Sequence, residues 1–262
     1  MTELLLDIQR WLMALTLALP RMLTVFTVLP FLAEPVLPGL IRTGIAISLT
    51  VVVLPLVDTQ LASVTLGTTA FIFLIAKETV LGLLIGYLIG LGFWAVGSVG
   101  AFIDTQRGAL SAHMFNPLVG EQTSPLGGFM TQAMATLLFA SGGFLSLLQL
   151  LYLSYVSWPV PSFYPAFNWE AVGFLLQQMD LLMYVMLLLA GPAIIIMLLA
   201  EIGMALIGRF VPQINVFLLA MPVKSALALL LLVLYMTAML HFVRDGFWQY
   251  PGLLNVLDGL LR

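Results

Sequence analysis

The 262-residue chain has no cysteine and few charges, which make up only 8% of its residues. Without cysteine it can form no disulfide, no thiolate nucleophile and no thiolate-bound metal site. In an ordinary soluble domain about a quarter of the residues are charged, whereas 62% of this chain is hydrophobic. This composition predicts an integral membrane protein or part of an apolar assembly, whose structural unit is a helix of about 20 apolar residues.

Further absences exclude several classes of function. The 9 basic and 12 acidic residues are scattered along the chain, and no two basic residues are adjacent. No basic face could therefore follow a phosphate backbone, and we expect no nucleic acid among the partners. No G-x-x-x-x-G-K-[ST] motif is present for binding a nucleotide phosphate. The only two histidines, His113 and His241, are a poor ligand set for zinc or copper. Ser111, His113 and Asp104 lack the nucleophile elbow of a serine hydrolase. We expect no metal, no cofactor and no enzymatic activity.

What the chain does contain is a series of apolar stretches of uneven length, which predicts an all-α, integral membrane-type protein with broken helices and helical hairpins. Some stretches are too long for one membrane crossing and others look too short. Prolines at 20, 30, 35 and 38 predict short or broken helices in the first third, and Gly191-Pro192 predicts a kink. The stretches are 4–19, 22–32, 43–57, 69–103, 126–157, 171–208 and 216–243.

Two segments define the predicted organisation of the chain. The N-terminus carries Glu3 and Asp7 where a secretory signal would be basic, so we expect it to be a retained helix. The segment 156–170 is rich in proline and aromatic residues, which suits a connection where apolar surface meets water. This connection predicts an N-terminal helical unit over 1–160 and a C-terminal helical hairpin with a tail over 161–262.

One helix face is made of small residues. Gly82, Gly86 and Gly90 recur at every fourth position, which is the spacing of a groove along a helix. A neighbouring backbone can approach closely along such a groove, so these glycines predict tight helix packing.

Asp104 and Arg107 follow a stretch, 79–103, without any charged residue. A separation of three residues allows the two side chains to meet on one helix face. Pairing would reduce the cost of about 2.5–3.5 kcal/mol for each ion at a bilayer centre. Either a structural ion pair or the polar lining of a water-filled path would account for these residues, since intramembrane charges tend to face cavities.

A second polar island lies at 198–225. Glu201 and Arg209 are about 12 Å apart along a helix, so each needs another partner. Pro212 is expected to end the helix and to leave carbonyl groups near Gln213 and Asn215 to be satisfied. These amides could hydrogen-bond the turn or could hold a subunit interface, and the residues alone do not decide between the two.

Several segments in and near these two polar regions resemble those of a known family. The segments "FIDTQRG", "FNPLVGEQTSP", "GRFVPQINVF" and "MPVKS", in this order, resemble the SctT/FliR family of type III secretion and flagellar export-gate proteins. "PRMLTVFTVLPFL" near the start fits as well, and Asp104-x-Gln106-Arg107-Gly108 is more similar to the virulence-type branch. The Pro212-Gln213-x-Asn215-x-Phe217 element is the most specific signal, and Lys224 lies in the segment that follows it.

The resemblance implies one copy of this subunit in a closed helical export-gate cone in the bacterial inner membrane, partly raised toward the periplasm. The implied partners are several copies of two smaller export-gate membrane subunits, the autoprotease switch subunit and unfolded secreted proteins. The resemblance also implies that the segment 108–124 is a plug-like loop, in which Met114 and Phe115 seal the pore and Asn116-Pro117 turn the chain. These two apolar residues could instead belong to an ordinary core.

The sequence thus predicts a non-enzymatic subunit that lines and closes a channel for unfolded proteins, with Asp104, Gln106 and Arg107 along the entry path. Energy would come from the ATPase and the proton-motive force that the family uses. The alternatives are a secondary transporter of small solutes or ions, with the broken helices as its binding site, and a membrane scaffold without a pore.

Overall fold

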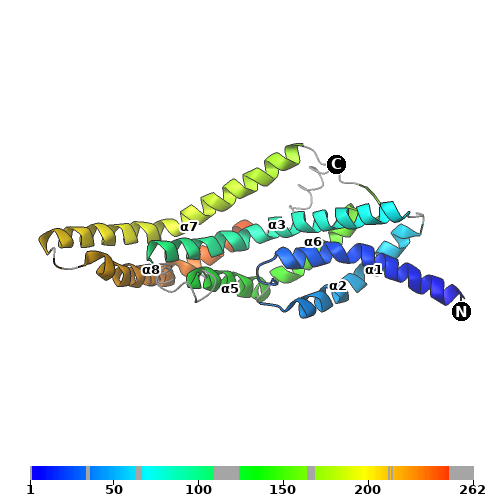
Figure 1. Cartoon of the computed structure of the whole chain (residues 1–262), viewed down its shortest axis with the longest axis horizontal. Coiled ribbons are helices and arrows are strands. Elements are labelled where there is room, and N and C mark those ends of the chain that lie inside the picture. Colours follow the sequence, from blue (N-terminus) through cyan, green and yellow to red (C-terminus); the bar gives the residue numbers. More distant parts are fainter. Residues whose placement is uncertain are drawn as a thin grey trace. The chain divides into compact units, whose positions relative to one another are not determined.

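The computed structural model describes residues 2–33, 36–62, 67–108, 124–163, 169–211, 213 and 215–247. Its regular elements over these ranges are all helices (Figure 1), which confirms the predicted all-α class. They are α1 (Thr2–Val28), α2 (Gly39–Leu61), α3 (Thr68–Gln106), α5 (Pro125–Ala140), α6 (Gly143–Ser157), α7 (Trp169–Phe210) and α8 (Val216–Phe247).

By length and composition, 4 helices of the described part could cross a membrane, or up to 6 spans if each of two bent pairs counts as one. The four are Ile8–Val28, Thr68–Gln106, Val172–Phe210 and Leu218–Val243. The two bent pairs are the halves of α2 and the successive helices α5 and α6. The uneven apolar stretches therefore correspond to uneven helices, and α7 alone has 42 residues.

Proline interrupts fewer helices than predicted. α1 continues through Pro20, and α7 continues through Pro192. The expectation of a break at Pro20 was therefore wrong. One missing donor does not end a helix whose flanking side chains, such as Leu17 and Met22, are completely buried in the core. Proline does distort α2, which bends by 62° between Val51 and Leu54. The ring of Pro55 would clash with the carbonyl of residue 51, four positions earlier.

The apolar stretch 126–157 forms two helices instead of one. α5 ends at Ala140, and Gly142 has a φ of 76° before α6 begins. This left-handed conformation is disfavoured for residues with a Cβ atom, so glycine permits the sharp change of direction here.

One compact unit comprises Met1–Leu91, Leu138–Gln178 and Gln249–Arg262. In its described part α1, α2, the first half of α3 and α6 bury a shared apolar core. The Arg10 side chain on α1 also pairs with Asp58 on α2, with Nε 2.7 Å from Oδ1. Core members of this unit are Leu17, Met22, Val25, Phe26, Leu74, Leu81, Ile85, Leu147 and Leu151.

The other compact unit comprises Gly92–Leu137 and Met179–Trp248. Here α7 and α8 form an antiparallel hairpin, in which the Tyr235 hydroxyl donates to the Leu189 carbonyl at 2.8 Å. The division into an N-terminal unit over 1–160 and a C-terminal hairpin with a tail over 161–262 stays a prediction.

Candidate functional site

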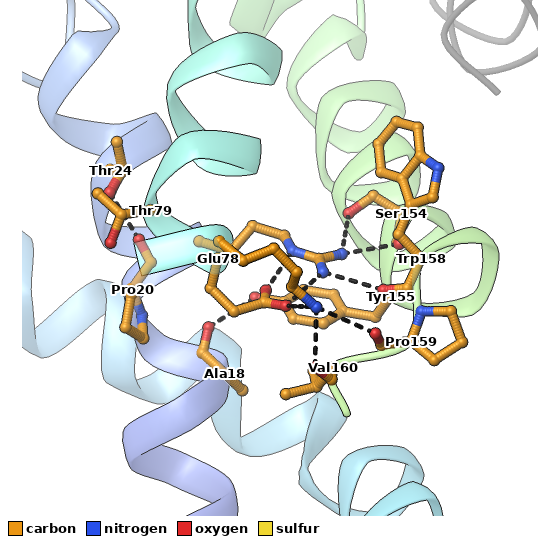
Figure 2. Close-up of polar contacts among 12 residues, drawn as sticks. Ala18, Pro20, Thr24, Glu78, Thr79, Ser154, Tyr155, Trp158, Pro159 and Val160 are labelled. Atoms are coloured by element: carbon orange, nitrogen blue, oxygen red, sulfur yellow. Dashed lines mark hydrogen bonds and ion pairs between the residues drawn. The ribbon is translucent and has the colours of Figure 1, made fainter. Parts of the chain in front are cut away.

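Arg21 lies at the centre of a buried polar cluster in the first compact unit. Its guanidinium makes two parallel contacts with the Glu78 carboxylate of α3, at 2.6 Å from Nε and 2.9 Å from Nη2. Nη1 donates to the carbonyl and hydroxyl of Ser154, and Nη2 also donates to the Trp158 carbonyl (Figure 2). All five N–H groups of the guanidinium are thus used. Both Arg21 and Glu78 are 0% exposed.

The close approach of α1 and α3 depends on small residues. A Cβ atom at Gly82 would lie 2.5 Å from the Arg21 carbonyl oxygen, and one at Gly86 would lie 3.1 Å from Cβ of Val28. Gly82 lies one turn after Glu78, on the same side of α3. The absence of a side chain there brings the α1 backbone close enough for Arg21 to reach Glu78.

Lys77 fixes the connection that follows α6. Its ammonium lies 2.7 Å from Oε1 of Glu78 and donates to the carbonyls of Pro159 and Val160 (Figure 2). It also donates to the Ser162 carbonyl at 3.0 Å. A connection with two prolines, at 159 and 161, has few backbone donors of its own. The ammonium therefore satisfies carbonyl groups that the backbone cannot.

Two further side chains complete this cluster, which we call the Arg21 cluster. The Tyr155 ring lies 4.2 Å from the guanidinium carbon of Arg21, and its hydroxyl donates to the Ala18 carbonyl. Gln60 of α2 donates to the Tyr155 carbonyl and accepts from the Val160 N–H. Four helices and one connection thus meet in a single polar network.

No sequence motif predicts the Arg21 cluster, because Arg21 is far from Lys77 and Glu78 in the chain. A usable signal was present. Arg21 and the Lys77-Glu78 pair each interrupt an apolar stretch, and ionisable groups in such segments almost always pair inside the protein. Nothing in the sequence, however, indicates that Ser154 and Trp158 would supply the remaining acceptors.

A second cluster surrounds Asp104 in the other compact unit, and the structure brings Asp104 and Arg107 into contact. Oδ1 of Asp104 accepts from Arg107 at 2.8 Å from Nε and 2.6 Å from Nη2. Oδ2 accepts from the Ser124 hydroxyl at 2.6 Å and from the Leu126 N–H at 2.8 Å. Asp104 is fully buried, Arg107 is partly exposed and Gln106 is exposed. The prediction of a polar path lining therefore rests on Gln106 and Arg107.

The polar island at 198–225 is looser. Lys224 of α8 lies 3.4 Å from Glu201 of α7, and the Glu201 side chain is 52% exposed. Arg209 is exposed near the end of α7. Asn215 Oδ1 accepts from the Leu218 N–H at 3.4 Å at the start of α8, and Gln213 is exposed. Glu201 thus finds a partner other than Arg209.

Several predicted residues lie outside the described part of the chain. Met114, Phe115, Asn116 and Pro117 belong to the range 109–123, and Pro212 and the Phe217 side chain are also outside it. Gly90 is buried in α3. Within the described residues, no three His, Asp or Glu side chains come close enough together to hold a metal ion.

The described residues define an all-helical, membrane-type protein with two buried clusters of paired charges. The model of the family described as bacterial export proteins, family 1, matches residues 12–250. The chain therefore belongs to this family, and the resemblance to SctT/FliR proteins is confirmed.

Individual relatives agree with the family. The chain is 47% identical over 234 residues to the Yop proteins translocation protein T of Yersinia pestis, covering 89% of each chain. It is 33% identical over 249 residues to the secretion system apparatus protein SsaT of Salmonella typhimurium, covering 93% of this chain and 96% of that one. Identity to the flagellar biosynthetic protein FliR of Bacillus subtilis is 27% over 236 residues, with 89% and 90% covered.

Proposed function

We propose that this chain is a core subunit of a type III protein export gate, which lines and closes a channel for unfolded proteins across the bacterial inner membrane. Family membership supports the coarser part, a membrane subunit of an export machinery, because relatives are named as translocation and secretion apparatus proteins. Several helices apolar enough to span a membrane support the location.

The observation that supports the more specific part of the proposal, a role within a multi-subunit export gate, is the uncovered apolar surface of α7 and α8. Only 33% of the α7 span and 22% of the α8 span is buried within the chain, against 67% of the α3 span. At 1.5 Å per residue α7 is about 63 Å long, whereas a bilayer core is about 30 Å thick. Lipid tails could cover only about half of that length. We infer that neighbouring protein subunits cover the remainder.

The proposed neighbours are several copies of two smaller export-gate membrane subunits, together with the autoprotease switch subunit. In the assembled cone, raised partly toward the periplasm, Gln106 and Arg107 would border the path of the unfolded substrate. Met114 and Phe115 would close the pore, and Asn116-Pro117 would turn the chain between them and α5. Flexible methionine and aromatic side chains can exclude water and still re-pack around a passing polypeptide.

Purification of the native complex tests the proposed assembly. A tagged full-length chain, extracted in mild detergent, is expected to elute as an oligomer that contains small hydrophobic subunits. A secondary transporter would instead be stable alone and would give substrate-dependent uptake in liposomes. An intact monomer with such uptake would overturn the proposal.

Leakage through the assembled complex tests the closing role. Replacing both Met114 and Phe115 by glycine removes the apolar seal, so ion leakage in vesicles is expected to rise at least several-fold. The matched control replaces two exposed polar residues of α5, Gln132 and Thr136, by alanine. Equal leakage in the assembled double-glycine complex and in the wild-type complex would contradict a closing role for this segment.

A further inference from the structure

We propose that Asp104 is a positioning residue that ties the end of α3 to the start of α5, and so fixes the two points from which the segment 109–123 begins and ends. The observation is that one buried carboxylate bonds both sides of this segment at once. The proposal deepens the proposed function and rests on it in one respect, because that function assigns pore closure to residues within the segment.

The two oxygens of Asp104 face different elements. Oδ1 accepts from Arg107, three residues later in the chain. Oδ2 accepts from Ser124 and Leu126, which lie 20 and 22 residues further along the chain. A structural ion pair with Arg107 would need only one of these oxygens. The second oxygen serves the start of α5.

The start of α5 needs such an acceptor. The first N–H groups of a helix have no partner inside the helix, and the helix dipole places partial positive charge there. Ser124 Oγ accepts from the Gly127 N–H at 2.8 Å, while the Leu126 N–H goes to Asp104. Asp104 therefore acts as a second cap on α5, supplied by another helix.

Small residues bring α3 and α5 together at this point. A Cβ atom at Gly100 would lie 2.5 Å from the Leu126 carbonyl oxygen, and one at Gly97 would lie 2.7 Å from Oγ1 of Thr131. Gly97, Gly100 and Asp104 follow helical spacing on one face of α3. The crossing thus places the carboxylate directly against the first turn of α5.

The chain also leaves α3 in a defined way. The Gly108 N–H donates to the Thr105 carbonyl, and Gly108 has a φ of 78°, which favours glycine. The Met221 side chain of α8 lies 3.2 Å from where a Cβ atom of Gly108 would be. The exit from α3 and the entry into α5 are therefore both fixed, and Asp104 bonds to Arg107 beside the exit and to Ser124 and Leu126 at the entry.

Distance measurement between two spin labels tests this role. The chain has no native cysteine, so cysteines can be introduced at two exposed positions, Thr105 on α3 and Phe129 on α5, and labelled in the assembled complex. Any cysteines of the partner subunits are replaced first. Asp104→Ala is expected to broaden the distance distribution at least twofold relative to the unmodified background. Gln132→Ala, which changes an exposed side chain on α5, is the matched control and should leave the distribution narrow.

Two more variants separate the cap from the ion pair. Arg107→Gln removes the ion pair and leaves Oδ2 on α5, so a narrow distribution is expected. The exchange Asp104→Arg with Arg107→Asp keeps opposite charges but places no acceptor at α5, so a broad distribution is expected. A narrow distribution for the exchange, or for Asp104→Ala, would overturn the proposal. If the Asp104→Ala complex does not assemble, Ser124→Ala replaces it, because this change removes one contact of Asp104 and the contact with the Gly127 N–H. The distance distribution should then broaden partially. An unchanged distribution would overturn the proposal.

Ion leakage in the same complexes separates this inference from the proposed function. A broad distribution with unchanged leakage would support the positioning role of Asp104 and would count against pore closure by residues 114–117. Raised leakage with a narrow distribution would overturn the positioning role and leave the closing role intact.

Discussion

The Arg21 cluster and the Glu201–Lys224 pair show two ways in which the same chain accommodates charge. Arg21 and Glu78 are completely buried, at 2.6 Å, and every guanidinium N–H has an acceptor. Glu201 and Lys224 are 3.4 Å apart, and half of the Glu201 side chain is exposed. The first arrangement is complete within the subunit. The second leaves a carboxylate on the apolar surface that we assign to neighbouring subunits.

Among the substitutions that test this comparison, Glu78→Gln should lower the stability of the protein most. This change leaves two buried cations, Arg21 and Lys77, without their carboxylate, and breaking a buried pair in this way costs about 3–5 kcal/mol. The loss should appear as a lower unfolding temperature of the purified complex in detergent. Asp58→Asn, which weakens the partly exposed pair with Arg10, is the control. Equal shifts for both variants would mean that burial does not distinguish the two pairs.

Gly82→Ala should cause the next largest loss of stability. The added Cβ atom would lie 2.5 Å from the Arg21 carbonyl, a backbone atom that cannot rotate away. Overpacking of this kind typically costs about 1–3 kcal/mol. Gly44→Ala on α2, where no atom lies within 4 Å of the new Cβ, should instead be neutral or stabilising by up to about 1 kcal/mol. Thermal unfolding of both variants measures the difference, and the same sign for both would contradict the close approach of α1 and α3.

Lys77→Met is expected to act locally. Arg21 still pairs with Glu78, but three carbonyls of the connection after α6 lose their donor. Each unsatisfied buried polar group costs about 1–3 kcal/mol, and opening toward water reduces that cost. Hydrogen exchange at residues 160 and 162 should therefore speed up more than exchange within α6. Uniform acceleration across the unit would instead indicate that Lys77 supports the whole core.

Glu201→Gln should have the smallest effect in the isolated chain. Exposed ion pairs contribute about 0–1 kcal/mol. The same substitution in the assembled complex sharpens the comparison, because a neighbouring subunit that covers Glu201 would bury its charge. A larger destabilisation of the complex than of the chain, measured by unfolding temperature, is expected. Identical effects in both would place Glu201 away from any subunit contact.

Some of the fold follows directly from the amino-acid pattern. The apolar stretch 69–103 became α3, Thr68–Gln106, because a largely apolar run without proline has little alternative to a helix. α7 ends at Phe210 and α8 begins at Val216, at the polar island that the sequence shows between two apolar stretches. Pro20 shows the limit of local rules, since packing of the neighbouring residues overrides the missing hydrogen bond.

The clusters themselves could be predicted only in part. Asp104 and Arg107 are close in sequence, so their pairing followed from helical spacing. Their link to Ser124 and Leu126 did not, because it depends on how α5 crosses α3. The Arg21 cluster joins residues up to 137 positions apart, between Arg21 and Trp158. Such contacts are set by the three-dimensional arrangement of helices, which no single stretch of sequence encodes.

The carbonyl groups around Lys77 have a consequence for how the protein responds to its medium. Two cations share one carboxylate here, and the dipoles of the connection after α6 supply the remaining negative potential. Dissolved salt screens interactions between solvent-exposed charges, whereas it screens buried pairs much less. This cluster is buried, so its cohesion should persist in concentrated salt, whereas the pair between Arg10 and Asp58 weakens.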